Sequence, residues 1–196
     1  MSDFYLHCCN THLYCFMKEQ TYMPEVKVMT VATTLNSYLN NKACRYDMVE
    51  HPYSTTTAEA GTSSSIPLKK VAKAVVLHDQ NRYLVAAIPA MNMLVLPEVE
   101  RLIGCHAELA TEPELKRLFG DCDVGAIPAV GQAYGLKVIW DDALKDEDDI
   151  YLEAGDHRHL LHLKKSQFMR LMKNNPHGEI SCAPEELYDM SHLRMM

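Results

Sequence analysis

The sequence lacks the apolar segments that membrane or secreted proteins carry. No apolar run is long enough to cross a bilayer, because the longest candidates are interrupted by Lys73 in one case and by Pro89 and Asn92 in the other. A basic start followed by an unbroken apolar stretch is also missing, so no secretory signal is expected. The seven cysteines are odd in number and irregularly spaced, which does not fit a disulfide framework and favours free thiols in a reducing compartment. These absences predict a cytoplasmic protein.

Positive charge and the familiar catalytic motifs are scarce as well. The chain has 19 Lys and Arg against 26 Asp and Glu, a net charge of −7, which argues against coating a nucleic acid through a broad basic face. Contact with one short RNA end through a few local cations stays open. No P-loop, GxSxG, HExxH or paired CxxC motif is found. The remaining composition, 47% hydrophobic and 23% charged, is typical of one globular domain.

Residues 1–28 differ from the rest of the 196-residue chain. They place five metal-ligand residue types among aromatic side chains: His7, Cys8, Cys9, His12 and Cys15. Their spacing matches no zinc finger or ribbon, and a second ligand pair is missing. We therefore expect a weakly ordered N-terminal extension, no metal and no cofactor. A metal- or redox-active protein built on residues 7–15 is the least favoured of three functional hypotheses.

Hydrophobic periodicity predicts one domain over residues 29–175 and a polar, weakly ordered C-terminal tail over residues 176–196. The expected strands cover residues 45–50, 71–77, 83–88, 107–110, 137–140, 149–154 and 159–163. The expected helices cover residues 31–41, a segment between the Ser54–Thr57 run and Pro67, and residues 96–103, 112–119 and 165–173. Helices and strands mix without a steady βαβ rhythm. This order predicts an α+β fold in which helices flank a curved mixed β-sheet.

Lys73 is the first residue that could carry chemistry. In an alternating strand it shares a face with Val71, Val75 and Leu77, where an ammonium group is costly unless it reaches solvent or meets an anion. A lysine at the sheet edge that only reaches solvent is an equally good interpretation of the strand alone.

Two loops are the other candidates. The glycines of residues 125–131 allow unusual backbone angles, so that amide N–H groups could hold a carbonyl oxygen or an oxyanion, although many such loops only turn a corner. Residues 155–159 carry His157 and His159, whose imidazoles could transfer protons or form hydrogen bonds. His51-Pro52 is more typical of a turn than of a ligand-binding position.

Four of these motifs, taken in chain order, resemble a known family. They are His51-Pro52 with its threonine run, Val71–Leu77, the Gly125–Gly131 loop, and Glu153-Ala154-Gly155-Asp156-His157. Together they resemble the YbaK-type family of aminoacyl-tRNA deacylases, which is related to the editing insertion domain of bacterial prolyl-tRNA synthetases. The resemblance covers residues 29–175.

The resemblance implies a free-standing trans-editing enzyme with the YbaK-like fold. Such an enzyme hydrolyses the ester of a mischarged tRNA that carries a small wrong amino acid, without a metal, and acts as the second sieve of double-sieve editing. Its partner is the tRNA acceptor end, with no DNA and no membrane. An aminoacyl ester is already activated, so positioning of water and donation of amides to the carbonyl could suffice. A non-catalytic binding module of the same fold, which holds a charged tRNA end or a small ligand, is the alternative.

The resemblance also implies site residues. The catalytic set is Lys73, Gly125 and Ala126. The substrate-binding set is His51, Thr57, Ile127, Pro128, Ala129, Gly155, His157 and His159. Lys69, Lys70 and Arg158 are the further cations that we expect near the RNA. The family's Gly-x-x-x-Pro loop falls on residues 125–129, where Ala129 replaces the proline and Pro128 stands one residue early. This departure leaves the loop geometry and the substrate choice open.

Overall fold

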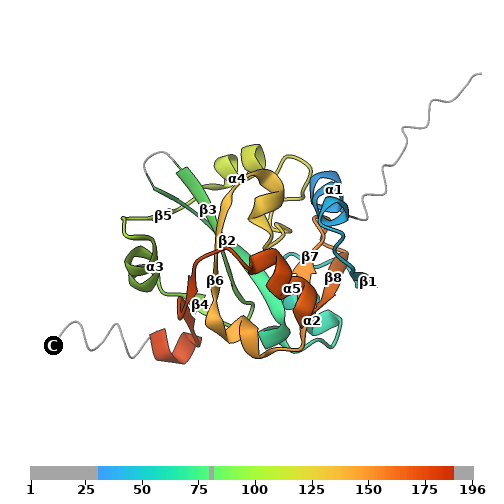
Figure 1. The fold of residues 1–196 in the computed structure, drawn as a ribbon. Helices are drawn as coiled ribbons and strands as arrows, with labels where there is room; N and C mark the ends of the chain where they lie inside the picture. Colours follow the sequence, from blue (N-terminus) through green and yellow to red (C-terminus); the bar gives the residue numbers. More distant parts are fainter. Residues whose placement is uncertain (1–30, 80–81, 188–196) are drawn as a thin grey trace, which may run out of the picture.

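A mixed sheet of eight strands forms the centre of the computed structural model, which describes residues 31–79 and 82–187 (Figure 1). Its strands are β1 (Asp47–Glu50), β2 (Val71–Asp79), β3 (Arg82–Pro89), β5 (Glu108–Leu109), β6 (Lys137–Asp141), β7 (Asp149–Glu153), β8 (His159–Lys164) and β9 (His177–Gly178). They follow the order β1-β8-β7-β2-β3-β6-β9, with β5 also paired to β2. A second, two-stranded sheet joins β4 (Met93–Leu94) to β10 (Ser181–Cys182).

Helices flank both faces of the sheet. They are α1 (Thr33–Asn41), α2 (Thr57–Ser63), α3 (Leu96–Ile103), α4 (Glu112–Leu118) and α5 (Lys165–Met172), with three short 3₁₀ helices at Leu68–Lys70, Gly131–Tyr134 and Asp142–Asp146. The pairing is parallel for β2 with β7, β3 with β6 and β6 with β9, and antiparallel for the other pairs. The predicted α+β class, with a mixed sheet between helices, is therefore confirmed.

The parallel pairing of β2 with β7 brings two ionisable residues to one face of the sheet. In this pair Ala72 lies opposite Leu152, and both are fully buried. Side chains alternate along a strand, and residues in register on neighbouring strands share a face. The next residues along the two strands, Lys73 and Glu153, therefore occupy adjacent positions on the opposite face from Ala72.

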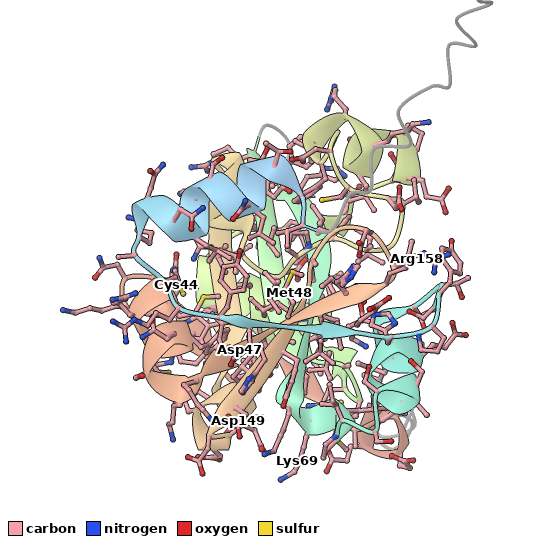
Figure 2. The ribbon with its side chains drawn as sticks, turned by 90° about the vertical axis from the view of Figure 1, so that its right-hand side faces the viewer. Cys44, Asp47, Met48, Lys69, Asp149 and Arg158 are labelled. Carbon is pink, nitrogen blue, oxygen red and sulfur yellow. The ribbon has the colours of Figure 1, made fainter. Side chains whose placement is uncertain are left out.

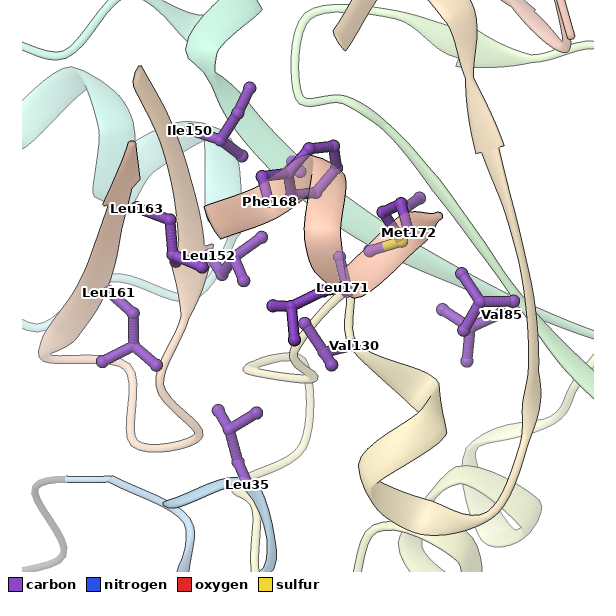
Figure 3. Close-up of a cluster of buried hydrophobic side chains, with 14 of the residues drawn as sticks. Leu35, Val85, Val130, Ile150, Leu152, Leu161, Leu163, Phe168, Leu171 and Met172 are labelled. Carbon is purple, nitrogen blue, oxygen red and sulfur yellow. The ribbon is translucent and has the colours of Figure 1, made fainter. Parts of the chain in front are cut away.

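The main hydrophobic core lies on the Ala72 face of the sheet. Figure 3 shows Phe168 and Leu171 of α5 packed over Leu152 and Leu163 of β7 and β8, with Leu35 of α1 at the side. The other face carries a smaller core beneath α3. Leu35, Leu152, Leu163 and Phe168 are fully buried, so this layer provides most of the rigid support for the strands and for the loops at their ends.

Helix α2 covers the part of the second face that carries Lys73 and Glu153. It approaches β2 closely, because a Cβ on Gly61 would lie only 2.8 Å from Leu68 Cδ2 and 3.0 Å from Val71 Cγ2. Only glycine fits there without a shift of these neighbours. The helix begins after Thr56, whose hydroxyl accepts a hydrogen bond from the Glu59 N–H at 3.2 Å. The Ser/Thr run therefore starts a helix, as its sequence predicts.

The C-terminal segment contradicts its prediction. Its polar sequence predicts a weakly ordered tail after Asn174, but residues 176–187 belong to the fold: β9 pairs with β6, and β10 pairs with β4. Ile180 is buried, and the Asp141 carboxylate accepts hydrogen bonds from the Ile180 N–H at 3.0 Å and the Ser181 hydroxyl at 2.7 Å. Strands of two residues show no periodicity, so the sequence contained no signal for them.

Two further expectations concern the ends of the chain and membranes. The N-terminal extension over residues 1–28, with its metal-ligand residue types, lies outside the described residues. Within residues 31–79 and 82–187, no helix is long and apolar enough to span a membrane.

Candidate functional site

Three segments that are distant in the sequence meet beside α2. The Ser54 N–H donates to the His157 carbonyl at 3.1 Å, and the His51 N–H donates to the Arg158 carbonyl at 2.8 Å, which joins the turn after β1 to the β7–β8 turn. The Asp123 N–H donates to the Gly155 carbonyl at 2.8 Å and attaches the loop that follows α4. The structure therefore brings the predicted residues 51–57, 125–129 and 155–157 together.

The meeting point depends on unusual backbone conformations. Gly125 has φ +96° and Gly155 has φ +112°, a region that residues with a side chain rarely adopt. A Cβ on Gly125 would lie 3.2 Å from the His157 ring, and one on Gly155 would lie 2.9 Å from Ala32 Cβ. His157 itself has φ +58°. Strained backbone of this kind often concentrates at functional sites.

The two buried histidines each present one nitrogen without a partner. His157 Nε2 lies 2.7 Å from the Val124 carbonyl, and His51 Nδ1 lies 2.8 Å from the Pro52 carbonyl. A carbonyl oxygen only accepts, so each of these nitrogens donates its N–H. A neutral ring then leaves the other nitrogen as an acceptor. His157 Nδ1 and His51 Nε2 are both buried and have no partner in the described part of the chain.

Glu153 adds a buried carboxylate that is not among the predicted site residues. It is fully buried, and neither of its oxygens makes a hydrogen bond of good geometry within the described residues, although the Thr57 hydroxyl lies close enough to interact with the carboxylate. Burial raises its pKa to about 7, the nearby Thr57 hydroxyl opposes this rise, and the negative charge of Asp156 adds to it. Such a group is costly to the fold, which makes it a candidate for function.

The unpartnered polar atoms are concentrated here. Together with the Ser54 hydroxyl, which is also buried and without a partner, they make five atoms on the converging segments or at the end of β7 next to them. Among residues 31–79 and 82–187, only Gln132 Oε1 adds a sixth elsewhere. We call His51, Ser54, Glu153 and His157 the buried acceptor cluster.

Glu153 and Ser54 were not predicted as site residues, because only the tertiary structure shows that their side chains are buried beside α2. Charge at the end of an apolar strand usually points to solvent, and only the sheet register shows that Glu153 faces α2.

Lys73 lies half-buried on the same face as Glu153. Its ammonium donates to the Ala90 carbonyl at 3.1 Å, and burial lowers its pKa. No carboxylate pairs with it in the described part of the chain, in contrast to Lys69, which pairs with Glu147 at 2.9 Å. Lys73 is therefore a cation still able to bind an anion.

The loop over residues 125–129 offers backbone groups, and not side chains, for binding a ligand. The side chains of Ile127 and Ala129 are buried in the main core, and Ala126 is also fully buried. The Ala126 N–H donates to the Asp123 carbonyl at 3.1 Å, whereas no hydrogen bond among the described residues uses the other N–H groups of the loop. Pro128 has no N–H. The amides of this loop with free donor capacity are thus those of Gly125, Ile127 and Ala129.

The remaining predicted residues have partners of their own. His159 Nδ1 lies 2.6 Å from Asp156 Oδ2, while Asp156 Oδ1 accepts the Arg158 and His159 N–H groups at 3.0 Å. These contacts shape the β7–β8 turn. Lys70 lies 3.8 Å from an Asp149 oxygen, so it is partly neutralised, as Lys69 is. No group of three metal-ligating side chains that could hold an ion occurs among the described residues.

Comparison with known proteins identifies the family. Residues 51–171, well over half of the chain, match the family described as the aminoacyl-tRNA editing domain. The chain belongs to this family. The matched range contains all three converging segments, and the resemblance inferred from the sequence motifs is confirmed. No curated protein matches the sequence.

Solved structures share the fold at identities that indicate the fold alone. A candidate trans-editing enzyme for prolyl-tRNA synthetase is 22% identical with a TM-score of 0.68, over 78% of this chain and 97% of that chain. A hypothetical protein is 18% identical with a TM-score of 0.68, over 76% of this chain and 99% of that chain. A candidate signal transduction protein from Marinobacter aquaeolei VT8 is 17% identical with a TM-score of 0.60, over 76% of this chain but 30% of that chain.

Proposed function

We propose that this editing-domain protein is a trans-acting aminoacyl-tRNA deacylase. It hydrolyses the ester between a small wrong amino acid and the terminal ribose of a tRNA. The observation that carries the proposal is the buried acceptor cluster beside the 125–129 loop, because its free groups match the groups of an aminoacyl ester. Family membership supports the substrate class.

The acceptor cluster suits the α-ammonium group of the aminoacyl ester. An ammonium offers three N–H donors and a positive charge. Glu153 offers two unpartnered oxygens, and a cation beside it favours its ionised form. His51 Nε2 and His157 Nδ1 are further acceptors for the ammonium, for the attacking water or for the neighbouring ribose hydroxyl.

The 125–129 loop suits the ester carbonyl. As water attacks the carbonyl carbon, negative charge develops on the carbonyl oxygen, and backbone N–H groups stabilise it without a charged side chain. The amides of Ile127 and Ala129 have the donor capacity for this role, and Gly125 holds the loop in its turn. The bond from the carbonyl carbon to the ribose oxygen then breaks. The ribose oxygen takes up a proton, and the free amino acid leaves.

Lys73 provides the positive charge of the site. Its ammonium is half-buried and has no carboxylate partner among the described residues, so a phosphate of the RNA end or the developing oxyanion is a fitting anion. A second sieve must admit a small amino acid and exclude a larger one, and we propose that the 125–129 loop and the segments packed against it set this limit. This size limit is the basis of the second sieve.

A deacylation screen tests the proposal. Transfer RNAs charged with alanine, cysteine or serine are incubated with the protein, and the release of the amino acid is followed under single-turnover conditions. We expect at least one of these small residues to be released much faster than in buffer, and addition of a chelator should not change the rate. A protein that accelerates none of these reactions would refute the proposal.

The screen also separates hydrolysis from binding alone. A non-catalytic module of the same fold would hold the charged tRNA and protect its ester, so it would slow the spontaneous release. Ala129 stands where the family has a proline, so the non-catalytic alternative has to be tested as well.

A further inference from the structure

An open groove lies on the outer side of α2, next to the buried acceptor cluster. Its volume is about 470 Å³, and it is lined by Tyr53, Ser54, Ala58, Glu59, Thr62 and Ser63. Thr57, Ala60 and Gly61 on the other side of α2 are buried. The groove therefore uses the helix face that the hydrophobic core leaves free, and Ser54 links it to the cluster. We call it the outer groove.

Tyr53 is an unusually exposed aromatic residue at the end of this groove. It is 57% exposed, although a large apolar ring is normally covered. Its ring centroid lies 5.3 Å from that of His157, and the Arg158 guanidinium lies 5.7 Å from it, over the ring. Tyr53 is thus held in place by groups that adjoin the cluster, while more than half of the residue remains exposed.

We propose that the outer groove binds the terminal nucleoside of the tRNA acceptor end, with its base stacked on Tyr53 and its phosphate near Arg158. This inference rests on the proposed function and extends it from the ester to the nucleoside that carries the ester. Unpaired RNA ends are commonly bound by stacking of a base on an aromatic ring beside an arginine. Tyr53 and Arg158 supply this combination.

The polar groups of the outer groove match a nucleoside. The Thr62 and Ser63 hydroxyls donate to the carbonyls of Ala58 and Ala60, so their free lone pairs face outward as acceptors. Both hydrogen bonds from Thr55 reach one oxygen of Glu59, which leaves the other oxygen able to accept. The exocyclic amine of adenine and the ribose hydroxyls are donors. Negative Glu59 repels phosphate, so the phosphate belongs on the Arg158 side.

The position of the outer groove fits the position of the ester. The terminal nucleoside carries the amino acid on its own ribose, so the base and the ester must bind within a few ångström of each other. Tyr53 contacts the ring of His157 on one side and adjoins Ser54 on the other, and both are members of the cluster. Figure 2 looks onto the edge of the sheet formed by β1, with Arg158 at one end of this side of the molecule.

Binding of short RNAs tests the inference without requiring catalysis. The probes are a labelled single-stranded RNA that ends in CCA and the same RNA with an abasic ribose in place of the last nucleoside. We expect the intact protein to bind the first probe about 5- to 150-fold more tightly, which is the usual range for one stacked base. Equal affinity for the two probes would overturn the inference.

Variants assign this preference to the outer groove. Tyr53→Ala should abolish the preference for the intact base, while Tyr53→Phe and Tyr53→Trp should keep it, because they retain a stacking surface. Met48→Ala is the matched control, since Met48 is 49% exposed and lies on β1 away from the groove. Circular dichroism confirms that each variant is folded. A Tyr53→Ala variant that keeps the full preference would also overturn the inference.

Deacylation rates separate this inference from the proposed function. With a charged tRNA, Tyr53→Ala should raise KM with a smaller effect on kcat, because stacking binds the substrate and the reacting atoms are untouched. If the intact protein deacylates and Tyr53→Ala has an unchanged KM, the inference fails and the proposed function stands. If the intact protein does not deacylate but prefers the CCA probe in a Tyr53-dependent way, the proposed function fails and the nucleoside site stands.

Discussion

Glu153→Gln should change how the stability of the protein depends on pH. Burial raises the pKa of Glu153 to about 7 in the folded chain, against an ordinary value of 4.5. Between these two pH values the folded chain keeps the proton and the unfolded chain releases it. The contribution of Glu153 to the free energy of unfolding is therefore fully present below pH 4.5 and is lost as the pH rises towards 7.

The size of the effect follows from the difference between the two pKa values. At about 1.4 kcal/mol for each pH unit, it amounts to about 3 kcal/mol. No discount for solvent screening applies, because Glu153 is fully buried. Glutamine has nearly the same shape and no charge, so Glu153→Gln should remove this part of the pH dependence, whatever its effect on stability at low pH.

Urea unfolding between pH 4.5 and pH 8 measures this difference. We expect the intact protein to lose about 3 kcal/mol more stability across this range than Glu153→Gln, with the loss levelling off above pH 7. Comparison of the two proteins cancels the titration of all other groups. Parallel stability curves would show that the Glu153 carboxylate is not held in an apolar environment, and the argument for the buried acceptor cluster would fail with it.

Three further changes test the site and its support. Lys73→Ala should lower single-turnover deacylation by about 100-fold with an unchanged circular dichroism spectrum, and Lys73→Arg should not restore it fully; wild-type rates in the alanine variant would remove Lys73 from the site. Gly125 and Gly135 have φ +96° and +72°, so Gly125→Ala and Gly135→Ala should each lower the free energy of unfolding by about 1–2 kcal/mol in urea. Only Gly125→Ala should slow deacylation, because nothing lies within 4 Å of a Cβ on Gly135. Asp141→Ala should cost about 2–4 kcal/mol, since the buried Ile180 N–H and a neighbouring hydroxyl lose their acceptor; an unchanged urea midpoint would contradict this.

The sequence predicts those elements whose hydrophobic period or capping residues extend over several positions. The helix predicted over residues 96–103 forms α3 with the same bounds, and the hairpin predicted over residues 71–77 and 83–88 forms most of β2 and β3. The strands β9 and β10 were missed because two residues have no period. They are held by contacts to Asp141, far away in the sequence.

The sequence predicted the loops of the candidate site, but it did not predict the buried groups inside the site. Motif order pointed to residues 51–57, 125–129 and 155–157, which the structure brings together. The unpartnered state of Glu153 depends on the pairing of β7 with β2, and the free amides of Ile127 and Ala129 depend on the turn that uses the Ala126 N–H. Register and turn geometry are tertiary properties, so local sequence patterns do not contain them.

The parallel pairing of β2 with β7 also determines when the site forms. Parallel strands need a long connection, and here it spans the whole chain from the end of β2 to the start of β7. Contacts between residues so far apart form late in folding, because the entropy of closing the intervening loop is lost before they contribute. A chain emerging from the ribosome therefore places Lys73 beside Glu153 only after β7 has been synthesised and has docked. The nascent protein thus has no complete site during most of its synthesis.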